Sequence, residues 1–272
     1  MDTYPPSSPV LFHPPCSWVT RRNFLVDYSY FALRSILTLI IILYRWSIST
    51  PLAFLYYSFD LSTIYSGNKV SNLGIGGHAF DATLYNSPGV STTDKRVGSA
   101  ALGFVASSAQ YIQIPPLTIG SSGLTFAFWF KSSGSGTFAR VFDFGNNPPG
   151  FNTANENIYF AINNNGADVN SQPPTPITDS YHQYDVFSVN VNDGVWRHVV
   201  WTIDISGNWL VYLNGVLAKS YNRIVYPPII PRVYNYLGRS GWAKDPYLNG
   251  VIDEFYMFNS VLSAPQVSAL AH

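Results

Sequence analysis

Short runs in which apolar and polar residues alternate fill most of the chain after residue 50. In the run 209–213 the odd positions hold Trp, Val and Leu and face the opposite way from the even ones, which is the period of a strand. The run 196–204 precedes it across a Ser-Gly-Asn turn, and Asn214-Gly215 follows it. Because Asn-Gly favours a tight type I′ turn, the pattern predicts a hairpin that continues into a third strand over 216–219.

The same kind of pattern continues toward the C-terminus. Two further strands are predicted over 233–238 and 249–258, after a Pro-rich loop. Ser263 can cap a short closing helix that reaches Leu270, with Pro265 tolerated in its first turn. Hairpins and turns at this density predict an antiparallel all-β domain. The aromatic residues expected in its core are Phe126, Phe128, Phe130, Trp196 and Phe255.

Six short phrases in this region follow one another in a fixed order. Together they resemble the laminin-G-like, concanavalin-A-like jelly-roll domains, and the resemblance covers roughly residues 52–271. It implies a two-sheet antiparallel jelly-roll sandwich, but much less about function, because one sandwich hosts many unrelated activities. The phrases are Leu55-Tyr56-Tyr57-Ser58-Phe59-Asp60, Val97-Gly98-Ser99-Ala100-Ala101-Leu102, Leu124-Thr125-Phe126-Ala127-Phe128-Trp129-Phe130, Trp196-Arg197-His198-Val199, Tyr212-Leu213-Asn214-Gly215, and Gly250-Val251-Ile252-Asp253-Glu254 with Leu262-Ser263.

The amino-acid composition limits the classes of partner that the chain is expected to bind. The chain has 272 residues, a formal net charge of zero and only 11% charged residues. A basic nucleic-acid footprint is therefore absent, and no nucleic-acid partner is expected. The polar surface must come from Asn, Ser, Thr, Gly and Tyr, as in Asn163-Asn164-Asn165-Gly166. Such a surface suits hydrogen bonding to sugars, packing into an assembly, or an ordinary neutral exterior.

The chain before the sandwich divides into two parts. Residues 1–22 are rich in proline and predict a disordered tail, and residues 23–49 are strongly apolar and predict one helix. The uncharged centre of this helix is about 15 Å long, against a hydrocarbon core of about 30 Å. The helix spans a membrane only if the arginines at its two ends snorkel toward the headgroups. The residues of this predicted membrane helix are Arg34, Ile40, Ile41, Ile42, Leu43 and Arg45.

Two alternatives remain for the apolar segment. Ser47-Ile48-Ser49 resembles a signal-peptide cleavage site, although the leader before the apolar centre is longer than usual. The second alternative is a helix that is buried in a partner protein, because short apolar stretches often have that role. If the segment is an anchor, Arg21, Arg22 and Arg34 on its N-terminal side keep the N-terminus cytoplasmic. The sandwich, residues 50–272, then lies on the lumenal or extracellular side.

The sequence contains few of the residue patterns that form catalytic sites. A retaining glycosidase needs two carboxylates about 5 to 5.5 Å apart, but the two glutamates, Glu156 and Glu254, stand outside the spacing that such enzymes of this fold use. Gly-x-Ser-x-Gly is absent, and the one cysteine, Cys16, precedes the sandwich. His198 lies inside a strand phrase and is expected to be a packed structural histidine. We therefore expect no enzyme, and a glycoside hydrolase is the less favoured alternative.

A structural Ca²⁺ is the one cofactor that we consider. Calcium takes hard oxygen ligands from carboxylates, and the resemblance implies such an ion at one edge of the sandwich. The candidate ligands are Asp60 at the end of the first strand, Asp81 in the following loop and Asp253 in the closing strand. Asp60 and Asp253 would lie close if the first and last strands pair. The alternative is that these carboxylates cap turns and accept loop N–H bonds.

Aromatic residues make up 16% of the chain. Most belong to the predicted core, so a platform for stacking on sugar rings would come from loops. The candidate ligand-binding residues are Trp242, Tyr247, Tyr181 and Tyr226.

The sequence therefore predicts a non-catalytic recognition module, anchored to a membrane, that binds glycan or protein at a surface. The alternative is a structural component of a large assembly, such as a minor capsid protein of a virion anchored to a membrane. The basis of this alternative is an analogy, because the Asn/Tyr/Ser-rich, Glu-poor composition is similar to that of surface proteins of large DNA viruses.

Overall fold

The computed structural model describes residues 51–146, 148, 156–163, 166–171, 183–185, 189–222 and 224–272. Within these ranges no helix is both long and apolar enough to cross a membrane. Both predictions for the chain before the sandwich lie outside the described residues. They are the tail over 1–22 and the apolar helix over 23–49, with Arg34, Ile40, Ile41, Ile42, Leu43 and Arg45.

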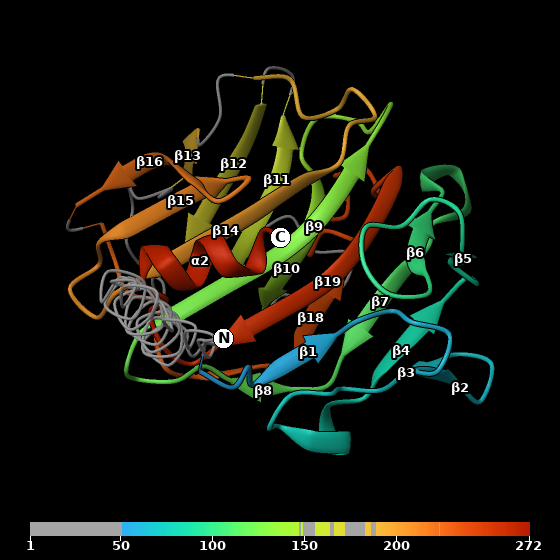
Figure 1. Ribbon diagram of the computed structural model, residues 1–272, viewed down its shortest axis with the longest axis horizontal. Coiled ribbons are helices and arrows are strands. Elements are labelled where there is room, and N and C mark those ends of the chain that lie inside the picture. Colours follow the sequence, from blue (N-terminus) through green and yellow to red (C-terminus); the bar gives the residue numbers. More distant parts are fainter. Residues whose placement is uncertain are drawn as a thin grey trace, which may run out of the picture. The chain divides into compact units, whose positions relative to one another are not determined.

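Two antiparallel sheets form a sandwich (Figure 1). In the described residues the eight-stranded sheet has the order β16 (Val216–Tyr221), β15 (Trp209–Leu213), β14 (Arg197–Ile203), β9 (Leu124–Ser132), β19 (Gly250–Phe258), β6 (Ala101–Phe104) and β5 (Gly89–Ser91), with β1 (Leu55–Tyr57) also paired to β19. The nine-stranded sheet has the order β13 (Gln183–Asp185), β12 (Gly166–Ser171), β11 (Ile158–Asn163), β10 (Ala139–Gly145), β18 (Tyr234–Leu237), β7 (Tyr111–Ile114), β4 (Ala82–Tyr85), β3 (Lys69–Val70) and β2 (Ile64–Tyr65). The predicted all-β sandwich is confirmed.

A two-stranded sheet, two 3₁₀ turns and one helix complete the described part. Strands β8 (Leu117–Thr118) and β17 (Pro231–Arg232) form a two-stranded sheet, and η1 (Gly77–Phe80) and η2 (Ala106–Ser108) are single 3₁₀ turns. Helix α2 (Ala264–Leu270) begins after Ser263, whose backbone N–H donates to the Gln266 side chain in a capping box. The predicted closing helix is therefore confirmed.

Local sequence explains the hairpin of β14, β15 and β16. Ile203 pairs with Trp209, as the alternation predicts. Asn214 and Gly215 both have positive φ, 51° and 80°, which is the backbone of a type I′ turn. The turn therefore leads the chain directly into β16.

The core lies between the facing sheets and is mainly aromatic. Rings from β9 meet rings from β10, as where Phe126 and Phe142 stack with centroids 4.5 Å apart. The largest fully buried side chains between the sheets include Phe126, Phe128, Phe130, Phe142, Phe144, Phe160 and Trp201.

Trp196 is not part of this core, and that prediction was wrong. Along β14 the residues Val199 and Trp201 face inward, so the even positions face outward. Trp196 has an even number and so continues the outward-facing positions of the strand. It is half-buried, and its indole N–H donates to Asp94 at 3.0 Å. Its ring therefore covers the outer surface of the sheet.

Strand β19 contains a bulge at Glu254. The register against β9 shifts between Asp253 and Tyr256, and Glu254 has a φ of 53°. The extra residue changes the parity of the strand, so that Phe255 enters the core while Tyr256 faces outward. The buried Glu254 carboxylate accepts hydrogen bonds from the hydroxyls of Tyr56 and Tyr256, which ties β1 to the bulge.

Helix α2 covers part of the outer face of the eight-stranded sheet, in front of β14 and β9 in Figure 1. Its Val267 belongs to a second apolar cluster with outward residues of the sheet. The other buried members of this cluster are Ala53, Ala127, Val200, Tyr212, Phe258 and Leu262. The central strand β9 is therefore buried on both faces.

The two tryptophans of this region give a matched test of the packing. Trp201→Ala should lower the free energy of unfolding by about 3 to 5 kcal/mol, because it removes a fully buried aromatic side chain. Trp196→Ala should lower it by less than half as much, since that ring is half-buried. Urea denaturation followed by circular dichroism measures both values, and equal losses would contradict the assignment of inner and outer faces.

Candidate functional site

Two glycines that pair across neighbouring strands leave a depression on the outer face of the eight-stranded sheet. Gly89 of β5 pairs with Gly103 of β6, Gly103 pairs with Val251 of β19, and Val251 pairs with Lys131 of β9. Directly paired residues point to the same face of a sheet. The row therefore crosses four strands, about 14 Å, and two of its four side chains are missing. We call it the glycine row.

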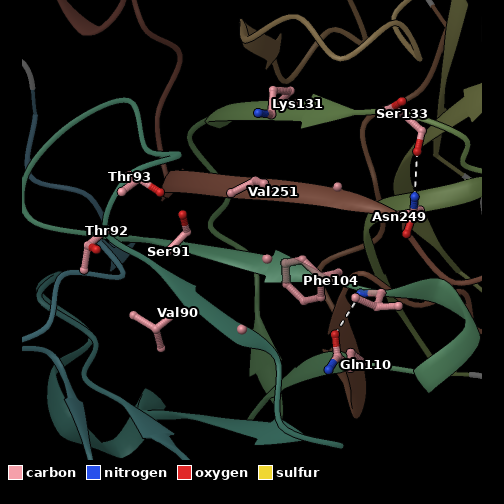
Figure 2. Close-up of a pocket in the computed structure, with 14 residues that line it drawn as sticks. Val90, Ser91, Thr92, Thr93, Phe104, Gln110, Lys131, Ser133, Asn249 and Val251 are labelled. Atoms are coloured by element: carbon pink, nitrogen blue, oxygen red, sulfur yellow. Dashed lines mark hydrogen bonds between the residues drawn. The ribbon is translucent and has the colours of Figure 1, made fainter.

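The glycine row is the floor of a groove of about 550 Å³ (Figure 2). Ser91, Thr92 and Thr93 lie at one end of the view, and Ser133, Asn249 and Gln110 lie at the other. The complete lining is Gly89, Val90, Ser91, Thr92, Thr93, Gly103, Phe104, Val105, Gln110, Lys131, Ser133, Asn249, Gly250 and Val251. Hydroxyl and amide groups therefore surround a floor that is open to solvent.

Hydrogen bonds hold the amide side chains of the wall in place (Figure 2). The Asn249 amide donates to the Ser133 carbonyl at 2.6 Å. The Gln110 side chain accepts from the Val105 N–H at 2.7 Å and donates to the Ser87 carbonyl at 2.8 Å. These walls are thus pre-organised, with their amides already oriented toward fixed partners.

The charge in the groove is compensated. The Lys131 ammonium forms an ion pair with Asp94, and the Trp196 indole N–H donates to the other oxygen of the same carboxylate. The ammonium also lies 5.7 Å from the centroid of the Trp196 ring. None of the fourteen residues that line the groove is an aspartate or a glutamate. The groove therefore presents a nearly neutral polar surface.

The loop that walls the groove is fixed to β19 by a buried carboxylate. Asp253 Oδ2 accepts from the N–H groups of Arg96 and Val97 at 2.8 and 2.9 Å. Burial raises the pKa of this carboxyl to about 6, against the opposing effect of the two N–H donors. Its Oδ1 is buried and has no hydrogen-bond partner among the described residues.

The three predicted calcium ligands do not come together. Asp60 and Asp253 lie near the same loop, since Asp60 accepts from Ser99, and the charge of Asp60 contributes to the raised pKa of Asp253. Asp81 instead precedes β4 and accepts from the Asn72 N–H at 2.7 Å and from Tyr65. In the ranges that the structure covers, no group of three or more His, Cys, Asp or Glu side chains is placed to hold a metal ion. Calcium binding stays a prediction.

The predicted stacking residues lie away from the groove. Trp242 packs edge-on against Tyr159, with centroids 5.9 Å apart, and the Tyr226 hydroxyl donates to the Gly120 carbonyl. The ring centroid of Tyr247 lies 6.2 Å from that of Tyr111, which is on the outer face of the nine-stranded sheet. Tyr181 lies outside the described residues.

The remaining predicted chemistry concerns His198. It is buried beside Trp129, with ring centroids 5.0 Å apart, and burial lowers its pKa to about 4. A neutral, packed imidazole agrees with the structural role that its strand phrase suggested.

These features define a lectin-like sandwich, with two antiparallel sheets and a solvent-facing groove on one of them. A laminin G-type family model of the concanavalin A-like lectin/glucanases superfamily matches residues 106–268, more than half of the chain. The chain belongs to this superfamily, as its six phrases predicted. No curated protein matches the chain.

Solved structures share the fold. Domain 4 of AbnA, a GH43 extracellular arabinanase from Geobacillus stearothermophilus in complex with arabinotriose, has a TM-score of 0.58 and 21% identity, over 81% of this chain and 98% of that one. The binding domain of Paraclostridial Mosquitocidal Protein 1 has a TM-score of 0.57 and 14% identity, over 81% and 52%. The ligand-binding domain of botulinum neurotoxin serotype D, in complex with N-acetylneuraminic acid, has a TM-score of 0.56 and 14% identity, over 80% and 50%.

The chain spans about half the length of these two toxin binding domains. At these identities the likeness shows the fold alone. Two of the three structures hold a saccharide, and one of those comes from a glycoside hydrolase.

The raised pKa of Asp253 predicts a pH dependence of stability. An unfolded aspartate has a pKa of about 3.9, so the folded chain binds a proton at higher pH than the unfolded chain. Through this group the free energy of unfolding therefore rises as the pH falls from 7 to 4, by about 2 kcal/mol relative to Asp253→Asn. Denaturation curves of both proteins across this range measure the difference.

Asp193→Asn is a control of opposite sign. A hydrogen bond from Arg197 lowers the pKa of Asp193 to about 2, so its contribution to stability is present above the unfolded pKa and is lost as the pH falls. Parallel pH curves for the wild type and Asp253→Asn would contradict the raised pKa of Asp253.

Proposed function

We propose that the chain is a non-catalytic recognition module whose groove binds a neutral saccharide. The observation that carries this proposal is the glycine row, because the absence of two side chains makes room for a ligand against the backbone. Ligand sites are commonly clefts of about 300 to 1,000 Å³ with a few fixed polar groups. A groove of about 550 Å³ with amides held in place matches this description.

The charge of the groove favours a neutral ligand. Lys131 is already paired with Asp94, so an anionic ligand would have to compete with that carboxylate. Sugar hydroxyls both donate and accept hydrogen bonds, and Ser91, Thr92 and Thr93 offer the same two capacities in return.

Binding without hydrolysis is the activity that this lining supports. Glycoside hydrolysis requires two carboxyl groups about 5 to 9.5 Å apart, and the groove is lined by none. The arabinotriose complex of the arabinanase domain lends support to a saccharide ligand, as does the N-acetylneuraminic acid complex of the neurotoxin domain. Binding of a protein surface is the alternative, and the solved binding domain of botulinum neurotoxin DC in complex with rat synaptotagmin II supports it.

The placement of the module is a separate proposal. We retain an anchor over residues 23–49, with the sandwich on the lumenal or extracellular side, on the strength of the apolar sequence and its flanking arginines. A role as a structural component of a virion is supported by composition alone.

Gly103→Leu tests the groove directly. A Cβ at this position would lie 3.5 Å from the Gly89 carbonyl oxygen, an ordinary contact, and Gly103 does not have a left-handed backbone. The variant should therefore fold, fill the floor of the groove and lower saccharide affinity at least tenfold. Isothermal titration of the full chain with arabinotriose, and with the best ligand from a glycan array, measures this change.

Ser220→Leu is the matched control, because it adds the same side chain to exposed strand β16 at the far edge of the sheet. It should bind as the wild type does. If Gly103→Leu folds and its affinity is unchanged, the groove is not the binding site. If the wild type binds no glycan on the array, the proposed function is wrong.

A further inference from the structure

The outer face of the nine-stranded sheet carries four tyrosines around one arginine. Tyr85 of β4 pairs with Tyr111 of β7, and their rings stack with centroids 4.7 Å apart and planes within 1°. The Tyr111 ring also meets Tyr236 edge-on at 5.6 Å and Tyr247 at 6.2 Å. Arg239 follows β18 and lies among these rings. We call these five residues the tyrosine–arginine surface.

Aromatic faces hold the guanidinium of Arg239. Its central carbon lies 4.7 Å from the ring centroid of Tyr111, 4.9 Å from that of Tyr236 and 5.9 Å from that of Tyr247. Such contacts fix a cation without neutralising it. Across the described part of the chain, no carboxylate forms an ion pair with Arg239, and the side chain is only partly buried.

A neighbouring arginine shows what a structural version of this arrangement looks like. The guanidinium carbon of Arg140 lies 3.8 Å from the ring centroid of Tyr159. However, this side chain is only 3% exposed, and its Nη2 lies 2.9 Å from Oδ2 of Asp245. Its charge is compensated inside the fold and is out of reach of a ligand. Arg239 combines the same aromatic support with a charge that solvent can reach and that no carboxylate of the described residues pairs with.

We propose that the tyrosine–arginine surface binds a saccharide that carries a carboxylate, such as a uronic acid unit. A planar guanidinium matches a carboxylate with two parallel hydrogen bonds. The residue Tyr85 is 38% exposed and, with Tyr247, offers an apolar face and a hydroxyl to a sugar ring. A simple carboxylate would use the guanidinium alone, whereas an acidic sugar also uses the rings.

This site is on the opposite sheet from the groove and does not depend on it. The test compares a glucuronic acid oligosaccharide with a neutral glucose oligosaccharide of the same length and linkage, by titration into the full chain. The acidic ligand should bind at least tenfold more tightly, and Arg239→Gln should abolish this preference. Added salt at 0.5 M should weaken the acidic ligand selectively, because the charge pair is partly exposed.

Lys219→Gln is the matched control. It removes one positive charge from the exposed strand β16 at the far edge of the other sheet, and it should leave the preference unchanged. Equal affinity of the wild type for the acidic and neutral ligands would overturn the proposal, and this comparison needs no variant to fold. Loss of uronate binding in Gly103→Leu would also overturn it, because it would place the ligand in the groove.

Discussion

The pairing of strand β19 is the constraint on which the rest of the sandwich depends. This strand lies between β9 and β6, and it also pairs with β1. The last described strand of the chain is thereby paired with the first. Its bulge at Glu254 directs Phe255 into the core and keeps Tyr256 outside. Without that extra residue, the parity of the strand would place one of these rings on the wrong face.

The outward residues of β19 also divide the outer face into three zones. Beside Tyr256, helix α2 and its apolar cluster cover the sheet. At Asp253 the loop that contains Arg96 lies over the sheet, since the carboxylate accepts two of its backbone N–H groups. Beside Val251, the glycines of the next two strands, β6 and β5, leave the surface open. The groove is therefore the part of this face that neither the helix nor the loop covers.

Periodicity in the sequence predicted the strands and the closing helix, because these depend on neighbouring residues. The pairing of the first and last strands, implied by the resemblance to known domains, is confirmed by the contact of Leu55 with Met257. Trp196 was misassigned, although the alternation of β14 places it on the outer face. The groove could not be found this way, because Gly89 and Gly103 meet only through the register of two strands. Periodicity could not place Asp81 either, since it precedes a strand of the other sheet.

Net charge describes this surface poorly, because each local charge depends on its partner. Lys131 and Arg140 are both cations beside aromatic rings, and each is compensated by an aspartate from a distant part of the chain. Arg239 has the same aromatic support, and none of the ion pairs of the described residues includes it. A chain with a formal charge of zero can therefore present a neutral groove on one sheet and a cationic aromatic surface on the other. The difference in charge between the two faces therefore follows from ion pairing, which the fold determines.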